Sequence, residues 1–135
     1  DSTEWRVRVS APANWNATDK TAYPNILLRL YRRAPDGKML LTAEAAQKNA
    51  TSISYANATL QLLDSIGFET RAPQLHPATG AYLMDSQSKF AFLRQAFLVK
   101  NGIAYSLTLS AKDSRLRSRH LRAFDRTLRS IEFVE

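Results

Sequence analysis

Two long apolar segments joined by Asn101-Gly102 constrain the fold of this chain more than any other feature. The first segment, Phe90–Lys100, reads FAFLRQAFLVK, and the second, Ile103–Ala111, reads IAYSLTLSA. An Asn-Gly pair between two such segments is typical of a β-hairpin closed by a type I′ turn, in which both central residues have positive φ. The sequence therefore predicts a long antiparallel hairpin.

The type I′ turn also fixes which side chains share a face of this hairpin. It pairs Leu98 with Tyr105 and Ala96 with Leu107 on one face. The other face holds Phe97, Val99, Ala104 and Ser106. Because both faces are largely apolar, both must be covered, and one helix on each side of the sheet would cover them.

The first third of the chain predicts three more strands. Glu4–Ala11 alternates apolar and polar residues, as a strand with one buried face does. Asn25–Arg33 is rich in branched and aromatic residues, and Met39–Ala46 returns as its partner. Between them, Pro35-Asp36-Gly37 is a turn signal in which the glycine is expected to tolerate positive φ.

Other segments predict short or irregular structure. Pro12 ends the first strand, and Trp15 is expected to fold over the edge of the core as a plug. Short strands are expected at Phe68–Ala72 and Ala81–Ser86. Irregular structure is expected at Asn16–Thr21, Pro73–Thr79 and Glu132–Glu135.

Thr51–Ile66 predicts a helix. Thr51 or Ser52 can cap its start, and Gly67 supplies a left-handed stop. Its side chains form two adjacent stripes, one of Ile53, Ala56, Leu60 and Leu63 and one of Tyr55, Thr59, Leu62 and Ile66. Asp64 is the one charged residue, so either the helix is largely buried or it offers an apolar surface to a partner.

Asp113–Ile131 predicts a second, amphipathic helix, capped by Asp113 or Ser114. The apolar side recurs at helical spacing in Leu121, Phe124, Leu128 and Ile131. The opposite side carries the arginine stripe, which consists of Arg115, Arg119, Arg122, Arg126 and Arg129. Arg117 lies off the stripe and is expected to pair with a carboxylate or to reach around the edge of the sheet.

Three interpretations of the arginine stripe are open. The net charge is +7, and arginine, the more abundant cation, is favoured in bidentate contacts with carboxylates and phosphates. The stripe can therefore bind an acidic protein surface, or it can bind phosphates of lipid or nucleic acid. It lacks the interleaved aromatic residues that stack on bases, so nucleic acid is not expected, and membrane contact would be peripheral at most. The third interpretation is a solvated face, partly neutralised by neighbours such as Asp125.

No catalytic, metal or cofactor site is predicted. The chain has no cysteine, which excludes thiolate metal sites and a Cys nucleophile, and its 4 glycines form no phosphate-binding loop. His120 is expected to be a packed or boundary residue rather than a base, and His76 has no carboxylate near it in sequence. An enzyme without a recognisable motif is the weakest alternative. Asn-Ala-Thr sequons at Asn16, Asn49 and Asn57 are interpreted as chance matches.

The order of these elements resembles the PsbP-like fold family. The resemblance rests on Ala11-Pro12-Ala13-Asn14-Trp15 after the first strand, on AYSLTL at 104–109 and on FDRTLRSI at 124–131. The fold is shared by the extrinsic photosystem II subunit, the Ran-binding nuclear import factor Mog and bacterial envelope proteins of the DcrB type. It implies one α+β domain over residues 1–135, a central antiparallel sheet with a helix on each face.

The resemblance also implies a function that is not catalytic, since members of the family mostly bind or chaperone other proteins. We therefore expect a protein-binding or assembly module without a cofactor, a monomer or part of a hetero-complex, which docks an acidic protein on the arginine stripe. The chain begins with Asp1 rather than Met, as a processed product or a trimmed sequence would. Together with the resemblance, this start gives the bacterial periplasm or cell envelope as the expected compartment, with the cytoplasm as the alternative.

Overall fold

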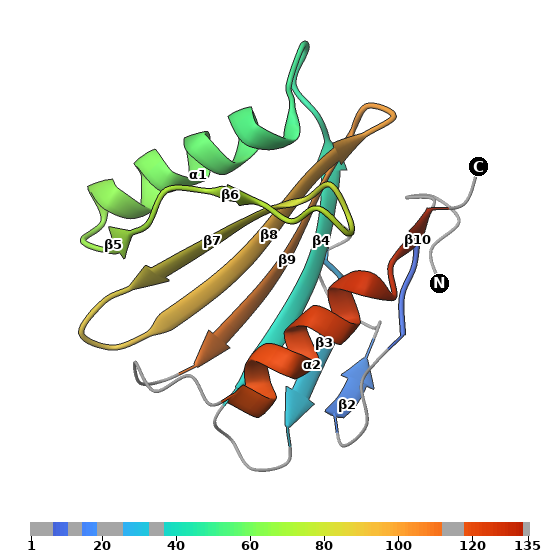
Figure 1. The fold of residues 1–135 in the computed structure, drawn as a ribbon, viewed down its shortest axis with the longest axis vertical. Helices are drawn as coiled ribbons and strands as arrows, with labels where there is room; N and C mark the ends of the chain where they lie inside the picture. Colours follow the sequence, from blue (N-terminus) through green and yellow to red (C-terminus); the bar gives the residue numbers. More distant parts are fainter. Residues whose placement is uncertain (1–6, 11–14, 19–25, 33–36, 112–117, 134–135) are drawn as a thin grey trace.

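The computed structural model describes residues 7–10, 15–18, 26–32, 37–111 and 118–133. Within them, an antiparallel sheet follows the strand order β2-β3-β4-β9-β8-β7-β5, with β6 also paired to β7, and β1 pairs separately with β10 (Figure 1). The strands are β1 (Val7–Arg8), β2 (Trp15–Thr18), β3 (Ile26–Arg32), β4 (Lys38–Ala45), β5 (Glu69–Thr70), β6 (Gln74–Leu75), β7 (Tyr82–Gln87), β8 (Phe92–Lys100), β9 (Ile103–Ala111) and β10 (Glu132–Phe133).

The predicted hairpin of β8 and β9 is confirmed in its register. Leu98 pairs with Tyr105 and Ala96 with Leu107. The turn has φ of 53° at Asn101 and 76° at Gly102, as a type I′ turn requires. Side chains of the two strands therefore alternate between the two faces of the sheet as the sequence predicts.

The second hairpin, β3 with β4, is also confirmed, but the role of Gly37 differs from the prediction. Gly37 does not have the positive φ seen at Gly67, Gly80 and Gly102. A Cβ atom at position 37 would instead lie 3.2 Å from Cδ2 of His120. The feature that distinguishes this glycine is therefore the side chain of His120, which lies against its backbone.

Short strands account for most of the other differences. The predicted loop Asn16–Thr21 begins inside β2, which pairs with β3, and β6 lies within the predicted loop Pro73–Thr79. The C-terminal segment Glu132–Glu135, which was predicted to be irregular, contains β10. Of the predicted strand Glu4–Ala11, the described part forms only the two residues of β1. Strands of two to four residues are too short to display alternation, so partners distant in sequence decide them.

Helix α1 (Ser52–Ser65) covers one face of the sheet. Thr51 caps it, and Gly67 follows it with φ of 97°, both as predicted. Ala56 and Leu63 pack on β7 and β8. The prediction that the helix is largely buried is wrong, because Leu62 and Ile66 are 61% and 63% exposed. Leu62 and Ile66 instead form an exposed apolar surface, which is the alternative stated for this helix from the sequence.

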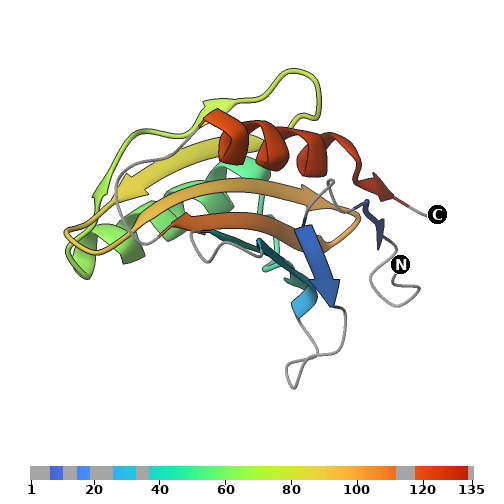
Figure 2. The same cartoon turned by 90° about the horizontal axis from the view of Figure 1, so that it is seen from below.

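Helix α2 (Ser118–Arg129) covers the opposite face (Figure 2). Its buried side, with Phe124 and Leu128, packs on Met39, Leu41 and Leu107 of the central strands. The predicted helix residues 113–117 lie outside the described residues. The expected α+β architecture, an antiparallel sheet with a helix on each face, is confirmed. Neither described helix is long and apolar enough to cross a membrane.

Candidate functional site

The exposed face of α2 carries three arginines of the predicted stripe, Arg122, Arg126 and Arg129. They are spaced about one helical turn apart and span about 10 Å of the helix axis, at ~1.5 Å per residue. The other side of the helix holds them in place, because Phe124 and Leu128 are only 1% and 6% exposed. The three guanidinium groups therefore project from a helix that is anchored to the sheet.

The structure describes less of the remaining members of the stripe, Arg119 and Arg115. The backbone of Arg119 lies in α2, while its side chain is outside the described residues. Arg115 and the off-stripe Arg117 lie wholly outside them. For these positions, the arrangement read from the sequence stays a prediction.

Arg129 is partly neutralised by a carboxylate on its own helix. Its Nε donates a hydrogen bond of 2.7 Å to Oδ2 of Asp125, one turn earlier. Exposed pairs of this spacing contribute about 0.3–0.5 kcal/mol. Neutralisation by Asp125 is thus confirmed for one arginine. Among the described residues, no carboxylate forms an ion pair with Arg122 or Arg126.

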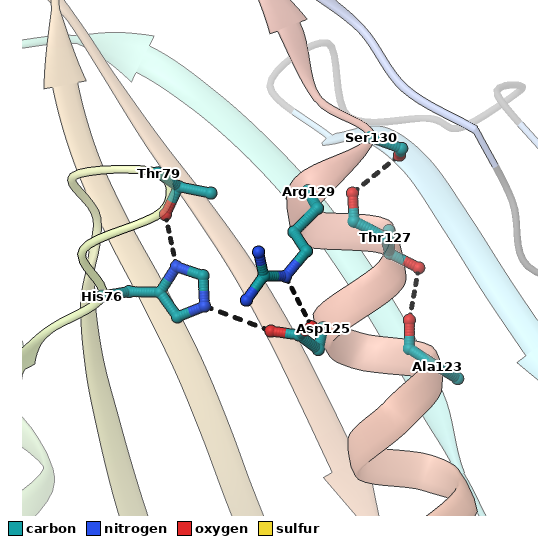
Figure 3. Close-up of polar contacts among 7 residues, drawn as sticks. All are labelled: His76, Thr79, Ala123, Asp125, Thr127, Arg129 and Ser130. Carbon is teal, nitrogen blue, oxygen red and sulfur yellow. Dashed lines mark hydrogen bonds and ion pairs between the residues drawn. The ribbon is translucent and has the colours of Figure 1, made fainter.

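Asp125 also connects α2 to the loop that follows β6 (Figure 3). Nε2 of His76 lies 3.1 Å from Oδ1 of Asp125, and Nδ1 of His76 lies 2.8 Å from Oγ1 of Thr79. Burial raises the pKa of the Asp125 carboxyl, but the hydrogen bonds of Arg129 and His76 together outweigh burial, so this pKa lies below its ordinary value. The carboxylate thereby holds the loop and the helix together.

The hydroxyl of Thr79, the imidazole of His76 and the carboxylate of Asp125 follow one another in the order that activates a nucleophile. Acyl transfer also needs N–H donors aimed at the developing oxyanion. In this turn the N–H groups of Thr79 and Gly80 both donate to the carbonyl of His76, and the N–H of Ala81 donates to Oγ1 of Thr79. All three donors are thus used within the turn, and the contacts of His76 with Thr79 and Asp125 fix the loop on α2.

Sequence reasoning missed this cluster. His76 and Asp125 are 49 positions apart, so no local motif links them. The expectation that His120 is packed is confirmed, since it is 2% exposed and lies edge-on to Trp15 with ring centroids 6.3 Å apart. Trp15 packs on the core beside it, as the predicted plug does, although it belongs to a strand. Within the described residues, no group of three or more His, Cys, Asp or Glu could hold a metal ion.

A pocket of about 320 Å³ opens beside the C-terminal end of α2. Its floor is the face of the sheet that α2 covers, with Ala96, Leu98 and Leu107. Lys100 and Arg129 also line it. This pocket could not be predicted from the sequence, because strands, α2 and the loop after β6 each contribute only part of its wall.

Comparison with known proteins bears on the fold. No protein-family model matches this chain, and no curated protein matches it significantly in sequence. The solution structure of cyanobacterial PsbP (CyanoP) from Synechocystis sp. PCC 6803 is similar to it, with a TM-score of 0.65 at 12% identity, over 98% of this chain and 89% of that one.

A crystal structure of a protein from Bacteroides thetaiotaomicron VPI-5482 is also similar, with a TM-score of 0.55 at 12% identity. The match covers 96% of this chain but 46% of that one, so this chain spans less than half of that protein. At such identities the likeness concerns the fold alone. The resemblance read from the order of the elements is confirmed at that level: the chain has the PsbP-like fold.

Proposed function

We propose that this chain is a non-catalytic protein-binding or assembly module of the bacterial cell envelope, which docks an acidic surface of a partner protein on α2. The observation that carries the proposal is the pair Arg122 and Arg126. Both are exposed, they lie one turn apart, and neither has a carboxylate partner among the described residues. In the proposal, Arg119 and Arg115 extend the same surface and Arg129 flanks it.

Arginine suits this role for a physical reason. A guanidinium group presents a rigid fork of donors that matches a carboxylate through two parallel hydrogen bonds. Charges at the rim of an interface mainly select the partner and speed its association. Two arginines on an anchored helix, neither paired with a carboxylate of the described residues, therefore favour a partner that carries carboxylates at a similar spacing.

Phosphates of lipid or nucleic acid are the alternative ligands of the same arginines. A helix that binds a bilayer buries its apolar side in the lipid, whereas the apolar side of α2, with Phe124 and Leu128, is already buried against the sheet. Binding of single strands needs exposed aromatic rings on which bases stack. The described exposed positions of α2 are Arg122, Arg126 and Arg129, none of them aromatic, which favours the acidic protein.

A pair of charge reversals tests the proposal. The variant Arg122→Glu/Arg126→Glu is compared with Lys48→Glu/Lys89→Glu, which changes the net charge equally at exposed positions elsewhere. Each protein is immobilised and incubated with envelope extract of the source bacterium. We expect wild type and the lysine variant to retain the same acidic partner, the arginine variant to lose it, and added salt to weaken retention as the Debye length falls below ~8 Å.

Equal retention of that partner by the arginine variant would contradict the proposal. Vesicles containing anionic lipid and duplex DNA form a second arm. If wild type binds either of them and the arginine variant does not, while partner retention is unchanged, the surface is a phosphate site instead.

The compartment is tested separately. The resemblance to envelope proteins of the DcrB type supports the envelope assignment. Fractionation of cells that express the tagged full-length gene product should recover it with the periplasm or membranes. Recovery with cytoplasmic proteins would overturn the envelope assignment. It would not bear on binding by the arginine surface, which has a separate test.

A further inference from the structure

The pocket beside the end of α2 has the size and lining of a small-ligand site. Its volume of about 320 Å³ lies within the range of ligand pockets, ~300–1,000 Å³. Three alanines line it, Ala78, Ala81 and Ala96, and their small side chains leave space that close packing of a core normally fills. The space corresponds to about ten molecules of liquid water, each occupying ~30 Å³.

The lining combines an apolar interior with a basic rim. Leu98, Leu107 and Leu128 contribute apolar walls, and the cationic residues are Lys100 and Arg129. None of the described residues that line the pocket is acidic. An apolar site with a few charged groups at its edge binds a molecule that has an apolar body and one charged end.

The two cations are not equivalent. Nε of Arg129 donates a hydrogen bond to Asp125, so the negative charge of that carboxylate already offsets the positive charge of Arg129 (Figure 3). Lys100 forms no ion pair among the described residues, and its Nζ lies 4.6 Å from the centroid of the Phe133 ring. This cation–π contact holds the ammonium group at the rim. The rim therefore has about one uncompensated positive charge, which matches a monoanion better than a dianion such as a phosphate monoester.

We propose that this pocket binds a small amphipathic carboxylate of the medium-chain fatty-acid kind. The hydrocarbon chain lies on the sheet floor at Ala96 and Leu98, and the carboxylate meets Lys100, with the guanidinium of Arg129 as a second donor. Burial of the chain supplies most of the affinity, since each buried CH₂ favours binding several-fold, and the cation selects the charge of the head group.

Titration followed by amide and methyl NMR tests the site, with decanoate as the probe below the concentration at which it forms micelles. Decylamine and acetate are the matched ligands, because the first reverses the charge and the second lacks the chain. We expect saturable shifts at Ala96, Leu98 and Leu107 with decanoate, clearly weaker binding of decylamine, and no shifts with acetate. Absence of these shifts with decanoate, or equal binding of decylamine, would overturn the proposal.

Two variants separate the chain site from the head-group site. Ala96→Leu fills the pocket and should abolish binding, and its spectrum without ligand reports whether it folds. Lys100→Gln changes an exposed residue and should weaken decanoate about tenfold, the usual effect of losing one charge-assisted hydrogen bond. Binding that is unchanged in Lys100→Gln and in folded Ala96→Leu places decanoate elsewhere and refutes the site.

The proposal for the pocket and the proposal for the arginine surface can be refuted independently of each other. The variant Arg122→Glu/Arg126→Glu leaves every residue that lines the pocket in place and should bind decanoate as wild type does at physiological salt. Conversely, Lys100→Gln should retain the protein partner of α2. Loss of decanoate binding in the arginine variant would contradict the assignment of the head group to Lys100.

Discussion

Gly37 lies against the imidazole of His120, and this contact makes a sharp prediction for one residue. A Cβ at position 37 would be 3.2 Å from Cδ2 and 3.3 Å from Nε2 of His120, whose side chain is buried and packed beside Trp15. Gly37→Ala should therefore lower the free energy of unfolding by about 1–3 kcal/mol through overpacking. Urea denaturation of wild type and variant measures the change.

A double-mutant cycle identifies the cause of that loss. His120→Ala destabilises the protein by itself, but it also frees the space that the new methyl group needs. The two changes together should cost less than the sum of their separate effects, with a coupling of about 0.5–3 kcal/mol. If the two effects simply add, the close approach is not what requires glycine at position 37.

Asp125 gives a prediction about pH. Its pKa is lower in the folded chain than its ordinary value of about 3.9, so the unfolded chain takes up the proton at higher pH. The stabilisation is therefore present above that ordinary value and is lost as pH falls through the folded pKa. From about pH 5 to 2, the melting temperature of wild type should fall more steeply than that of Asp125→Asn.

The control for this measurement is the same exchange at Asp64, an exposed carboxylate of α1 that forms no ion pair among the described residues. Asp64→Asn should retain the steep fall of wild type. Parallel melting curves for wild type and Asp125→Asn would show that the bonds from His76 and Arg129 do not stabilise the ionised form.

The same residues show what a sequence can indicate at this scale. The pair Asp125 and Arg129 was foreseeable, because side chains four positions apart on a helix are neighbours. The bond from His76 to Asp125 depends on how a loop is placed on α2, and no spacing encodes it. Likewise, Gly37 matched a turn signal, while the reason for glycine lay in a side chain far along the chain.

Among the elements, α1 begins with a capping box that can be tested directly. Oγ1 of Thr51 accepts a 3.1 Å bond from the N–H of Ser54, and Oγ of Ser54 accepts a 2.8 Å bond from the N–H of Thr51. Thr51→Ala should lower the free energy of unfolding by about 1 kcal/mol. Thr51→Ser keeps the hydroxyl and should lose little. Equal losses in both variants would show that the cap does not hold the helix end.

A helix, strand or turn was easier to predict when contacts between residues close in sequence stabilise it. The Asn101-Gly102 turn carries its own geometry, and it set the register of the longest hairpin correctly. Strands β2 and β10 are short and exist because a partner strand lies beside them. For α1, periodicity located the helix but overestimated its burial, since Leu62 and Ile66 extend the apolar stripe beyond the width of the contact with the sheet.

On the scale of the whole molecule, the sheet separates two cores. Phe97 packs with α1 on one face, and Phe124 of α2 packs on the other, each only 1% exposed. The two phenylalanines belong to different clusters and share no buried neighbour. Alternation along β8 is what places adjacent residues, Ala96 and Phe97, in different cores.

This separation predicts how substitutions combine. Phe97→Leu and Phe124→Leu should each lower the free energy of unfolding by roughly 1–2 kcal/mol, because each leaves unfilled space. Together they should lower it by the sum, within about 0.5 kcal/mol, since the sheet lies between them.

Phe97 also meets Tyr55 on its own face, with ring centroids 4.9 Å apart. Phe97→Leu with Tyr55→Leu should therefore deviate from additivity by about 0.5–1.5 kcal/mol. Urea denaturation of the five variants measures both couplings. A coupling between Phe97 and Phe124 as large as that between Phe97 and Tyr55 would mean that the sheet transmits packing changes from one core to the other.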